Sequence, residues 1–247
     1  MTTAAEVKRW TKSILAEHPD LRLNKRELYL SPTHHIHRFI LFAGSSDRTF
    51  PTPVASYRIL FMPPSYPTGY AWSNQLSVGW STDPEFAEKL IVCVRQVVNE
   101  ALRPLHSIEG LISLNNTQAV RGFGTTRIGH YPVLHAVVEA AMGHLDEVCN
   151  IVDARVAALE PGLNQTLSAG LVLQAKRPKS SDAAYMISGA IKGLQQLDEV
   201  KQLANYARKG DRGAIAGLLH QWEAKQVQKL GLEYAWQPTP FPLELHP

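Results

Sequence analysis

The residues VASYRILFM (54–62), followed by Pro63 and Pro64, decide how this sequence folds. Polar Ser56 and Arg58 alternate with apolar neighbours, and a period of two is typical of a β-strand. The two prolines cannot donate hydrogen bonds to a sheet, so they mark the end of the strand.

Three more stretches of strand character lie around it in the sequence. Apolar residues alternate over 21–30, form a nearly continuous run over 37–43, and alternate again over 75–80. Short turns rich in Gly, Ser, Asn and Asp separate these stretches, and no helical pattern intervenes. The sequence therefore predicts an antiparallel sheet of about four strands.

Helical periodicity precedes and follows the predicted sheet. Residues 4–17 form an amphipathic pattern, and a wide apolar stripe runs over 83–103, where Thr82 and Glu85 have the spacing of a capping box. Later helices are expected over 132–156 and 182–230. The stretch between them, Pro161–Ser181, contains Gly162, Gly170 and Pro178 and is predicted to be a connector.

These patterns predict an α+β fold, with the sheet packed by helices and followed by an α-helical C-terminal region. We expect a helix, antiparallel sheet and helix region over 1–115, and an α-helical region packed on it over 116–231. The proline-rich tail over 232–247 is expected to be extended or disordered rather than helical.

The overall composition is that of a folded protein. The chain has 247 residues, of which 45% are hydrophobic and 19% are charged, with a formal net charge of +3. These values exclude a disordered chain, a coiled coil and a disulfide scaffold. Cys93 and Cys149 lie on apolar helix faces, which indicates buried free thiols in a reducing compartment.

The sequence contains no apolar run of the length that crosses a membrane, and residues 1–10 do not have the pattern of a signal peptide. We therefore expect a cytoplasmic protein without a membrane partner. The near-neutral charge permits homo-oligomers. No pattern indicates a cofactor.

The shortage of charge is concentrated in one segment. Between Thr49 and Thr82 the only charged side chain is Arg58. A loop over 63–72 within this segment is rich in proline and aromatic residues, which provide large contact areas at interfaces. It either packs over the sheet or binds a protein partner; the residues predicted for such binding are Arg58, Tyr66, Tyr70, Trp72 and Trp80.

A histidine cluster, His34–His37, offers an alternative. His35 and His37 are two apart and would share one face of a strand, where they could bind the same metal ion. The alternative function is thus a metal-dependent hydrolase or nuclease, although the favoured interpretation of the cluster is polar residues at the start of a strand.

The loop around Gly122 and Gly124 is flanked by Arg121 and Arg127, which could bind an anion. It lacks the lysine and hydroxyl residue that complete a phosphate-binding loop. Nucleic-acid binding through these arginines and the basic run Lys176–Lys179 is disfavoured, because the run is short and neither half of the chain is basic.

Nucleophilic catalysis has no recognisable signature either. The sequence contains no Gly-x-Ser-x-Gly elbow, and its adjacent acidic residues fall on helix faces where solvated charge is usual. A non-catalytic protein is therefore favoured over an enzyme.

Four segments occur in the order RELYL (26–30), RFILF (38–42), YRILF (57–61) and ALRPL (101–105). This order resembles a bacterial family known as domain of unknown function four-three-zero-four. The resemblance covers about residues 5–155. It implies a helix, several antiparallel strands and a second helix, often with a helical extension. It also implies a small accessory protein that neutralises a toxin or serves a defence locus.

Together these observations predict a non-catalytic protein-binding module, either an immunity protein that neutralises a toxin or an adaptor. Its expected partner is a protein, such as a toxin or another defence component.

Overall fold

The computed structural model describes residues 2–44, 47, 49–66, 73–116 and 128–245. The chain divides into two compact units. The first comprises residues 1–60, 68–127 and 226–239, and the second comprises residues 61–67, 128–225 and 240–247. Each unit therefore includes part of the C-terminal segment, which the sequence predicted to be a separate tail.

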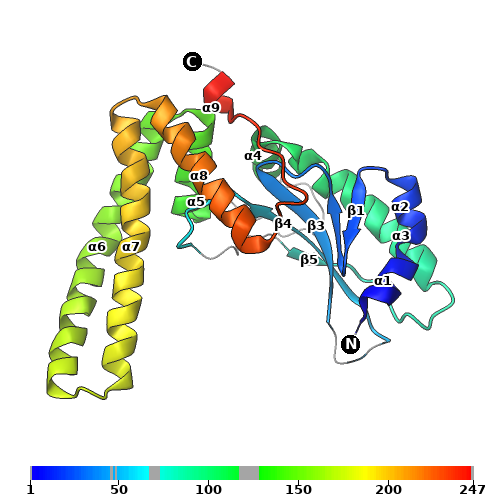
Figure 1. Ribbon diagram of the computed structural model, residues 1–247, viewed down its shortest axis with the longest axis horizontal. Coiled ribbons are helices and arrows are strands. Elements are labelled where there is room, and N and C mark those ends of the chain that lie inside the picture. The colour runs from blue at the N-terminus through cyan, green and yellow to red at the C-terminus, as the bar shows by residue number, and fades with distance from the viewer. Residues whose placement is uncertain (1, 45–46, 48, 67–72, 117–127, 246–247) are drawn as a thin grey trace. The chain divides into compact units, whose positions relative to one another are not determined.

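The first unit is built on an antiparallel sheet in which each strand pairs with the next along the chain (Figure 1). Its five strands, in spatial order, are β1 (Leu21–Asn24), β2 (Glu27–Leu30), β3 (Ile36–Ala43), β4 (Thr52–Ile59) and β5 (Ser73–Gln75). The predicted α+β fold with its antiparallel sheet is confirmed. The sheet has one strand more than expected because the stretch 21–30 forms a hairpin.

Helices of the first unit flank the sheet in the chain. The predicted helix over 4–17 is divided at Thr11 into α1 and α2, and the stripe over 83–103 becomes α3 and a π-helical turn. Glu85, not Thr82, precedes the first residue of α3, so the expected capping box is absent. The elements are α1 (Ala4–Trp10), α2 (Lys12–Glu17), α3 (Phe86–Val97), η1 (Val98–Leu102), η2 (Pro104–His106) and α4 (Ile108–Asn116).

One face of the sheet is apolar where Leu28 of β2, Ile40 of β3 and Ala55 of β4 lie side by side and are fully buried. Phe42 of β3 is fully buried there. The ring of Trp10 in α1 lies 6.3 Å from the Phe42 ring and 5.2 Å from that of Phe86 in α3. Strand and helices thus share one core.

The opposite face of the sheet is covered by the C-terminal part of the first unit. Tyr29 and Phe39 pack against Ala235. The backbone of Thr33 donates to Ala235 and accepts from Gln237, at 3.0 and 2.8 Å, and forms a parallel bridge with Trp236. A segment more than 200 residues away in the sequence therefore completes this layer.

The second unit is helical. Its described elements are η3 (Ile128–His130), α5 (Pro132–Met142), α6 (Leu145–Lys176), α7 (Ser181–Arg208), α9 (Pro242–Leu245) and most of α8 (Arg212–Leu230). α6 and α7 form a long antiparallel hairpin (Figure 1). Among the described residues, no helix combines the length and apolar character needed to cross a membrane.

Two expectations about this region are wrong. The predicted connector Pro161–Ser181 is helical as far as Lys176, so α6 continues through Pro161. The tail, expected to contain no helix, ends in the short helix α9.

Candidate functional site

The hairpin of α6 and α7, here called the arm, is supported unevenly along its length. On α7 the buried residues Ala183, Ala190 and Leu197 are seven apart, whereas buried residues follow more closely from Val200 onward. A single residue every seven is the pattern of a helix covered along one narrow seam. From Asp153 to the end of α6 only Gly170 is buried. We divide the arm into a distal half (161–194) and a base (145–160 and 195–208).

Glycines set the register of the distal half. A methyl group on Gly170 would lie 2.9 Å from Cγ1 of Ile187, and one on Gly193 would lie 2.6 Å from Cδ2 of Leu163. Both helices therefore approach closely where a glycine faces a large aliphatic side chain. This register places Val172 level with Tyr185.

Large apolar side chains are exposed around the distal half. Leu171 and Ile191 each follow a buried residue, and a helix turns by about 100° per residue. In an antiparallel pair this turn carries both side chains to the same side of the arm. Val172 and Tyr185 lie two residues beyond buried positions and therefore point outward, at the edges. The exposed fractions are 51% for Leu171, 56% for Val172, 80% for Tyr185 and 52% for Ile191.

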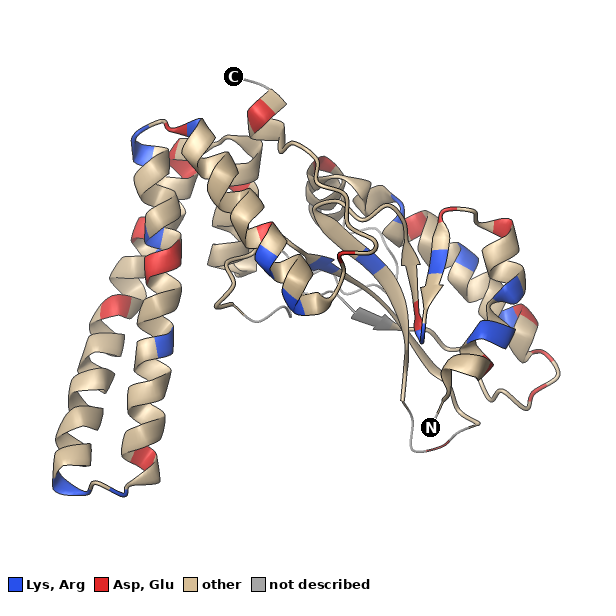
Figure 2. Cartoon of the chain, viewed as in Figure 1, with Lys and Arg blue, Asp and Glu red and all other residues tan. Residues whose placement is uncertain are grey.

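Charge divides the arm in the same place (Figure 2). The distal half has four basic residues and one acidic residue, whereas the base has three basic and six acidic. Three of the distal cations lie at the tip, where Arg177 and Lys179 line a hollow with Ser180 and Ser181. In the base, oppositely charged side chains form ion pairs with each other, as Lys201 Nζ and Glu160 Oε1 do at 2.5 Å. The distal half is therefore an apolar surface that ends in positive charge.

The residues predicted for protein binding in the 49–82 segment do not form one exposed patch. Tyr66 is only 5% exposed and therefore belongs to the core of its unit. Trp80 is 46% exposed and lies against Phe50, with ring centroids 5.0 Å apart. The guanidinium of Arg58 lies 4.5 Å from the centre of the Phe39 ring. Tyr70 and Trp72 lie outside the described residues.

The histidine cluster contacts the C-terminal segment of the first unit. His34 Nδ1 lies 3.0 Å from the Gln237 carbonyl oxygen, and His35 Nε2 lies 3.2 Å from Thr239 Oγ1. No group of three or more His, Cys, Asp or Glu side chains suited to a metal occurs among the described residues. Metal binding by His35 and His37 thus remains a prediction from the sequence, and the contacts indicate a docking role for His34 and His35.

His37 is completely buried between two partners. Its Nε2 lies 2.9 Å from Glu27 Oε1, and its Nδ1 lies 3.3 Å from Thr33 Oγ1. An acid, a histidine and a hydroxyl in this order are the parts of a nucleophilic triad. Thr33 is also completely buried, however, so its hydroxyl is closed to a substrate. The chain of contacts instead orients the backbone that binds the C-terminal segment.

The remaining sequence candidates are two arginines and two cysteines. Arg121 and Arg127 lie outside the described residues. Cys93 and Cys149 are free thiols, half-buried rather than fully buried as expected. Burial raises the pKa of both thiols, which disfavours the reactive thiolate.

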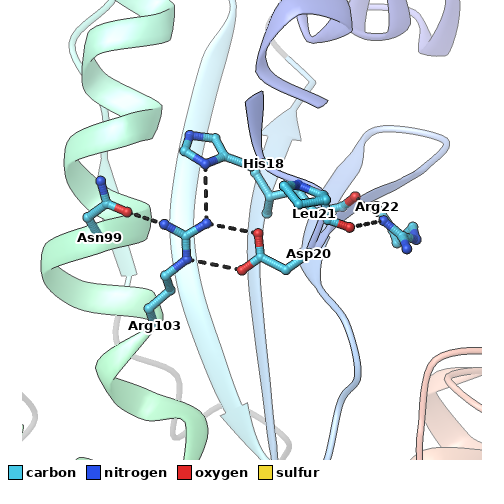
Figure 3. Close-up of polar contacts among 7 residues, drawn as sticks. His18, Asp20, Leu21, Arg22, Asn99 and Arg103 are labelled. Carbon is cyan, nitrogen blue, oxygen red and sulfur yellow. Dashed lines mark hydrogen bonds and ion pairs between the residues drawn. The ribbon is translucent and has the colours of Figure 1, made fainter. Parts of the chain in front are cut away.

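An ion pair fastens the start of the sheet to the end of the α3 segment (Figure 3). Arg103 donates to both oxygens of Asp20, at 2.8 and 3.0 Å, and also contacts His18 and Asn99. The Arg103 hydrogen bonds lower the pKa of Asp20, and Asp20 in turn raises that of Arg103. The Arg103 guanidinium is thus held by three side chains, which indicates a structural clamp.

Comparisons with protein-family models, with curated proteins and with solved structures found no match for this chain.

The arm surface was missed because the sequence between Pro161 and Ser181 was interpreted as a connector. A signal for it is present: no charged residue occurs from Pro161 to Ala175, whereas a solvated helix usually carries charged residues on its exposed face. This is a second charge-free stretch, in addition to the one near Arg58.

Proposed function

We propose that this protein is a non-catalytic protein-binding module that contacts its partner through the distal half of the arm. The observation that carries the proposal is the exposure of Leu171, Val172, Tyr185 and Ile191 on a helical pair covered only along its inner seam. Exposed large apolar side chains gathered on one element beside charged residues are typical of protein interaction sites.

The chemistry of the surface suggests the chemistry of the partner. Each of the four side chains is at least half exposed, so its complete burial contributes on the order of 1 kcal/mol. The cations at the tip, including Arg177 and Lys179, favour an acidic rim on the partner and accelerate its association. We therefore propose a heterologous partner with an apolar helical face bordered by carboxylates.

The biological role that accompanies this surface is that of an adaptor or an immunity protein. The resemblance noted in the sequence supports a toxin or another defence component as the partner. The alternative, a metal-dependent hydrolase or nuclease, has no further support in the described residues, where His34 and His35 contact the C-terminal segment.

Site-specific photo-crosslinking tests the proposal in the native cell. A photoreactive amino acid at position 172 of the arm is compared with the same amino acid at position 92 of α3. Val92 is a matched control for Val172, because both are valines on helices and their exposed fractions are 51% and 56%. We expect a discrete adduct with another protein at position 172 and none at position 92.

The captured partner is then purified and its affinity measured by calorimetry. Val172→Gln combined with Tyr185→Ser should weaken binding at least tenfold, and Val92→Gln should leave it unchanged. An adduct only between two copies of this chain, or an affinity equal for all variants, contradicts the proposal.

A further inference from the structure

A second surface, unrelated to the arm, lies in the first unit at the turn between β1 and β2. The turn residues and the C-terminal segment enclose a cavity of about 240 Å³. It is lined by Asn24, Lys25, Arg26, Glu27, Leu41, Arg58, Leu230, Gly231, Leu232 and Tyr234. We propose that this cavity, called the turn pocket, binds a small phosphate monoester.

The charge of the turn pocket is positive. Lys25, Arg26 and Arg58 provide three cations, and Glu27 provides the single carboxylate. One oxygen of that carboxylate lies 2.9 Å from Nε2 of buried His37. The pocket therefore has a surplus of positive charge that a dianion would neutralise.

The two arginines present donors for an anion. Nη1 of Arg26 is buried and has no hydrogen-bond partner among the described residues. A buried unpaired donor is costly, which favours a turn of the Arg26 side chain that brings Nη1 to an anionic oxygen in the pocket. The guanidinium of Arg58 is held over the Phe39 ring. Planar guanidinium groups bind phosphate through two parallel hydrogen bonds, which is why arginine suits this role.

The backbone at Lys25 supports a ligand-binding role independently. Lys25 has a φ of 54°, in the left-handed region where glycine and asparagine are favoured and lysine is not. It is the first of the two residues that join β1 to β2. Strained backbone of this kind persists where function requires a particular side chain, and here lysine adds the third cation of the pocket.

Neutral groups complete the site. Asn24 Nδ2 donates to the Tyr234 hydroxyl at 2.7 Å. Burial raises the pKa of Tyr234, so this phenol stays protonated and can donate to a ligand at neutral pH. Leu41, Leu230 and Leu232 offer an apolar wall for the organic part of an ester. A cavity of this size is below the usual range for larger ligands, which is about 300–1,000 Å³, and therefore favours a short carbon chain.

The test is isothermal titration calorimetry of the full chain with glycerol 3-phosphate, inorganic phosphate and succinate at fixed ionic strength. We expect glycerol 3-phosphate to bind at least tenfold more tightly than succinate and more tightly than inorganic phosphate. Equal or tighter binding of inorganic phosphate would assign the pocket to free phosphate, and preference for succinate would assign it to a carboxylate. Either result overturns the ester assignment, as does the absence of binding.

Substitutions test whether the ligand binds in the turn pocket. Arg26→Met should weaken binding at least tenfold. Lys25→Asn should also weaken it at least tenfold while raising the thermal unfolding midpoint, because asparagine tolerates this φ and carries no charge. Loss of binding together with greater stability cannot arise from unfolding. Lys12→Gln, on α2 outside the pocket, is the control for total charge and should leave binding unchanged; unchanged binding in Arg26→Met and Lys25→Asn would refute the assignment.

Discussion

The sheet of the first unit and the distal half of the arm differ in how much of their apolar surface is covered. Both faces of the sheet are covered, one through Trp10 and α3 and the other through the C-terminal segment around Ala235. The two helices of the distal half cover only each other along one seam, and Val172 and Tyr185 stay exposed. The comparison indicates that buried apolar contacts are concentrated around the sheet, whereas the distal half of the arm has exposed apolar side chains.

The largest expected effect is a loss of stability in the sheet, whose two faces are covered. Phe42→Ala removes a completely buried ring between β3 and the Trp10 ring and should destabilise the protein by about 3–5 kcal/mol. Leu171→Ala in the arm should change stability by less than about 0.5 kcal/mol, because exposed positions contribute little. Chemical denaturation followed by tryptophan fluorescence measures both. Similar losses in the two variants would contradict the contrast between the regions.

A smaller effect tests the seam of the arm. Gly170→Ala introduces a methyl group 2.9 Å from Ile187 and should cost about 1–3 kcal/mol through overpacking. Gly189→Ala is the matched control on α7, since no atom lies within 4 Å of the added methyl group. It should stabilise the helix by about 0.5–1 kcal/mol, the difference in helix propensity. Helical circular dichroism during thermal unfolding distinguishes them, and the interpretation fails if both variants are stabilised.

A pH effect of about 0.5 kcal/mol is expected where α9 meets α8 in the second unit. His220 contacts Glu223 at 3.7 Å and Glu244 at 2.9 Å, and the Phe241 ring lies beside it. Hydrogen bonding to Glu223 is the main cause that raises the pKa of His220. Because the pKa of His220 is raised in the folded state, these contacts stabilise the fold fully at pH values below the unfolded-state pKa, near 6.5. This stabilisation is lost as the pH rises through the folded-state pKa.

The thermal midpoint of the natural protein should therefore fall more steeply between pH 6 and pH 8.5 than that of His220→Gln. Parallel pH profiles for the two proteins would show that the contacts with Glu223 and Glu244 do not stabilise the fold.

The smallest effect concerns the clamp of Figure 3. Arg103→Met should cost less than about 1 kcal/mol at neutral pH, because both Arg103 and Asp20 are more than a third exposed. The pKa of Asp20 is lowered, so the pair stabilises the fold above the unfolded value of a carboxyl group, near 4. That stabilisation disappears as the pH falls through the folded value, so denaturation curves of variant and natural protein should converge at acid pH. A constant difference down to pH 2 would rule out the ion pair as its source.

Local sequence patterns predicted much of the fold. Alternation identified the strand at 54–62, and the apolar stripe identified α3, because both depend on neighbouring residues. The connector prediction over Pro161–Ser181 was wrong because Gly162, Gly170 and Pro178 were together interpreted as loop residues, although α6 continues to Lys176. In the structure Gly170 permits close packing against Ile187, a contact that sequence periodicity does not reveal.

The candidate sites were less predictable than the fold. Arg58 was identified as a binding residue, but its position over Phe39 and beside the turn pocket depends on strand register. Tyr66 was identified as an interface residue and is buried. The sequence contains the charge-free stretch from Pro161 to Ala175, but only its partner helix shows which side chains remain exposed.

The sequence by itself determined the α+β class, the antiparallel pairing and most helix positions, since these follow from periodicity and short turns. The tertiary structure alone decided what covers each surface. The contacts of Thr33 with Gln237 and of His35 with Thr239 join residues over 200 positions apart. Such contacts depend on how the whole chain folds, so no local pattern encodes which apolar face is buried and which stays exposed.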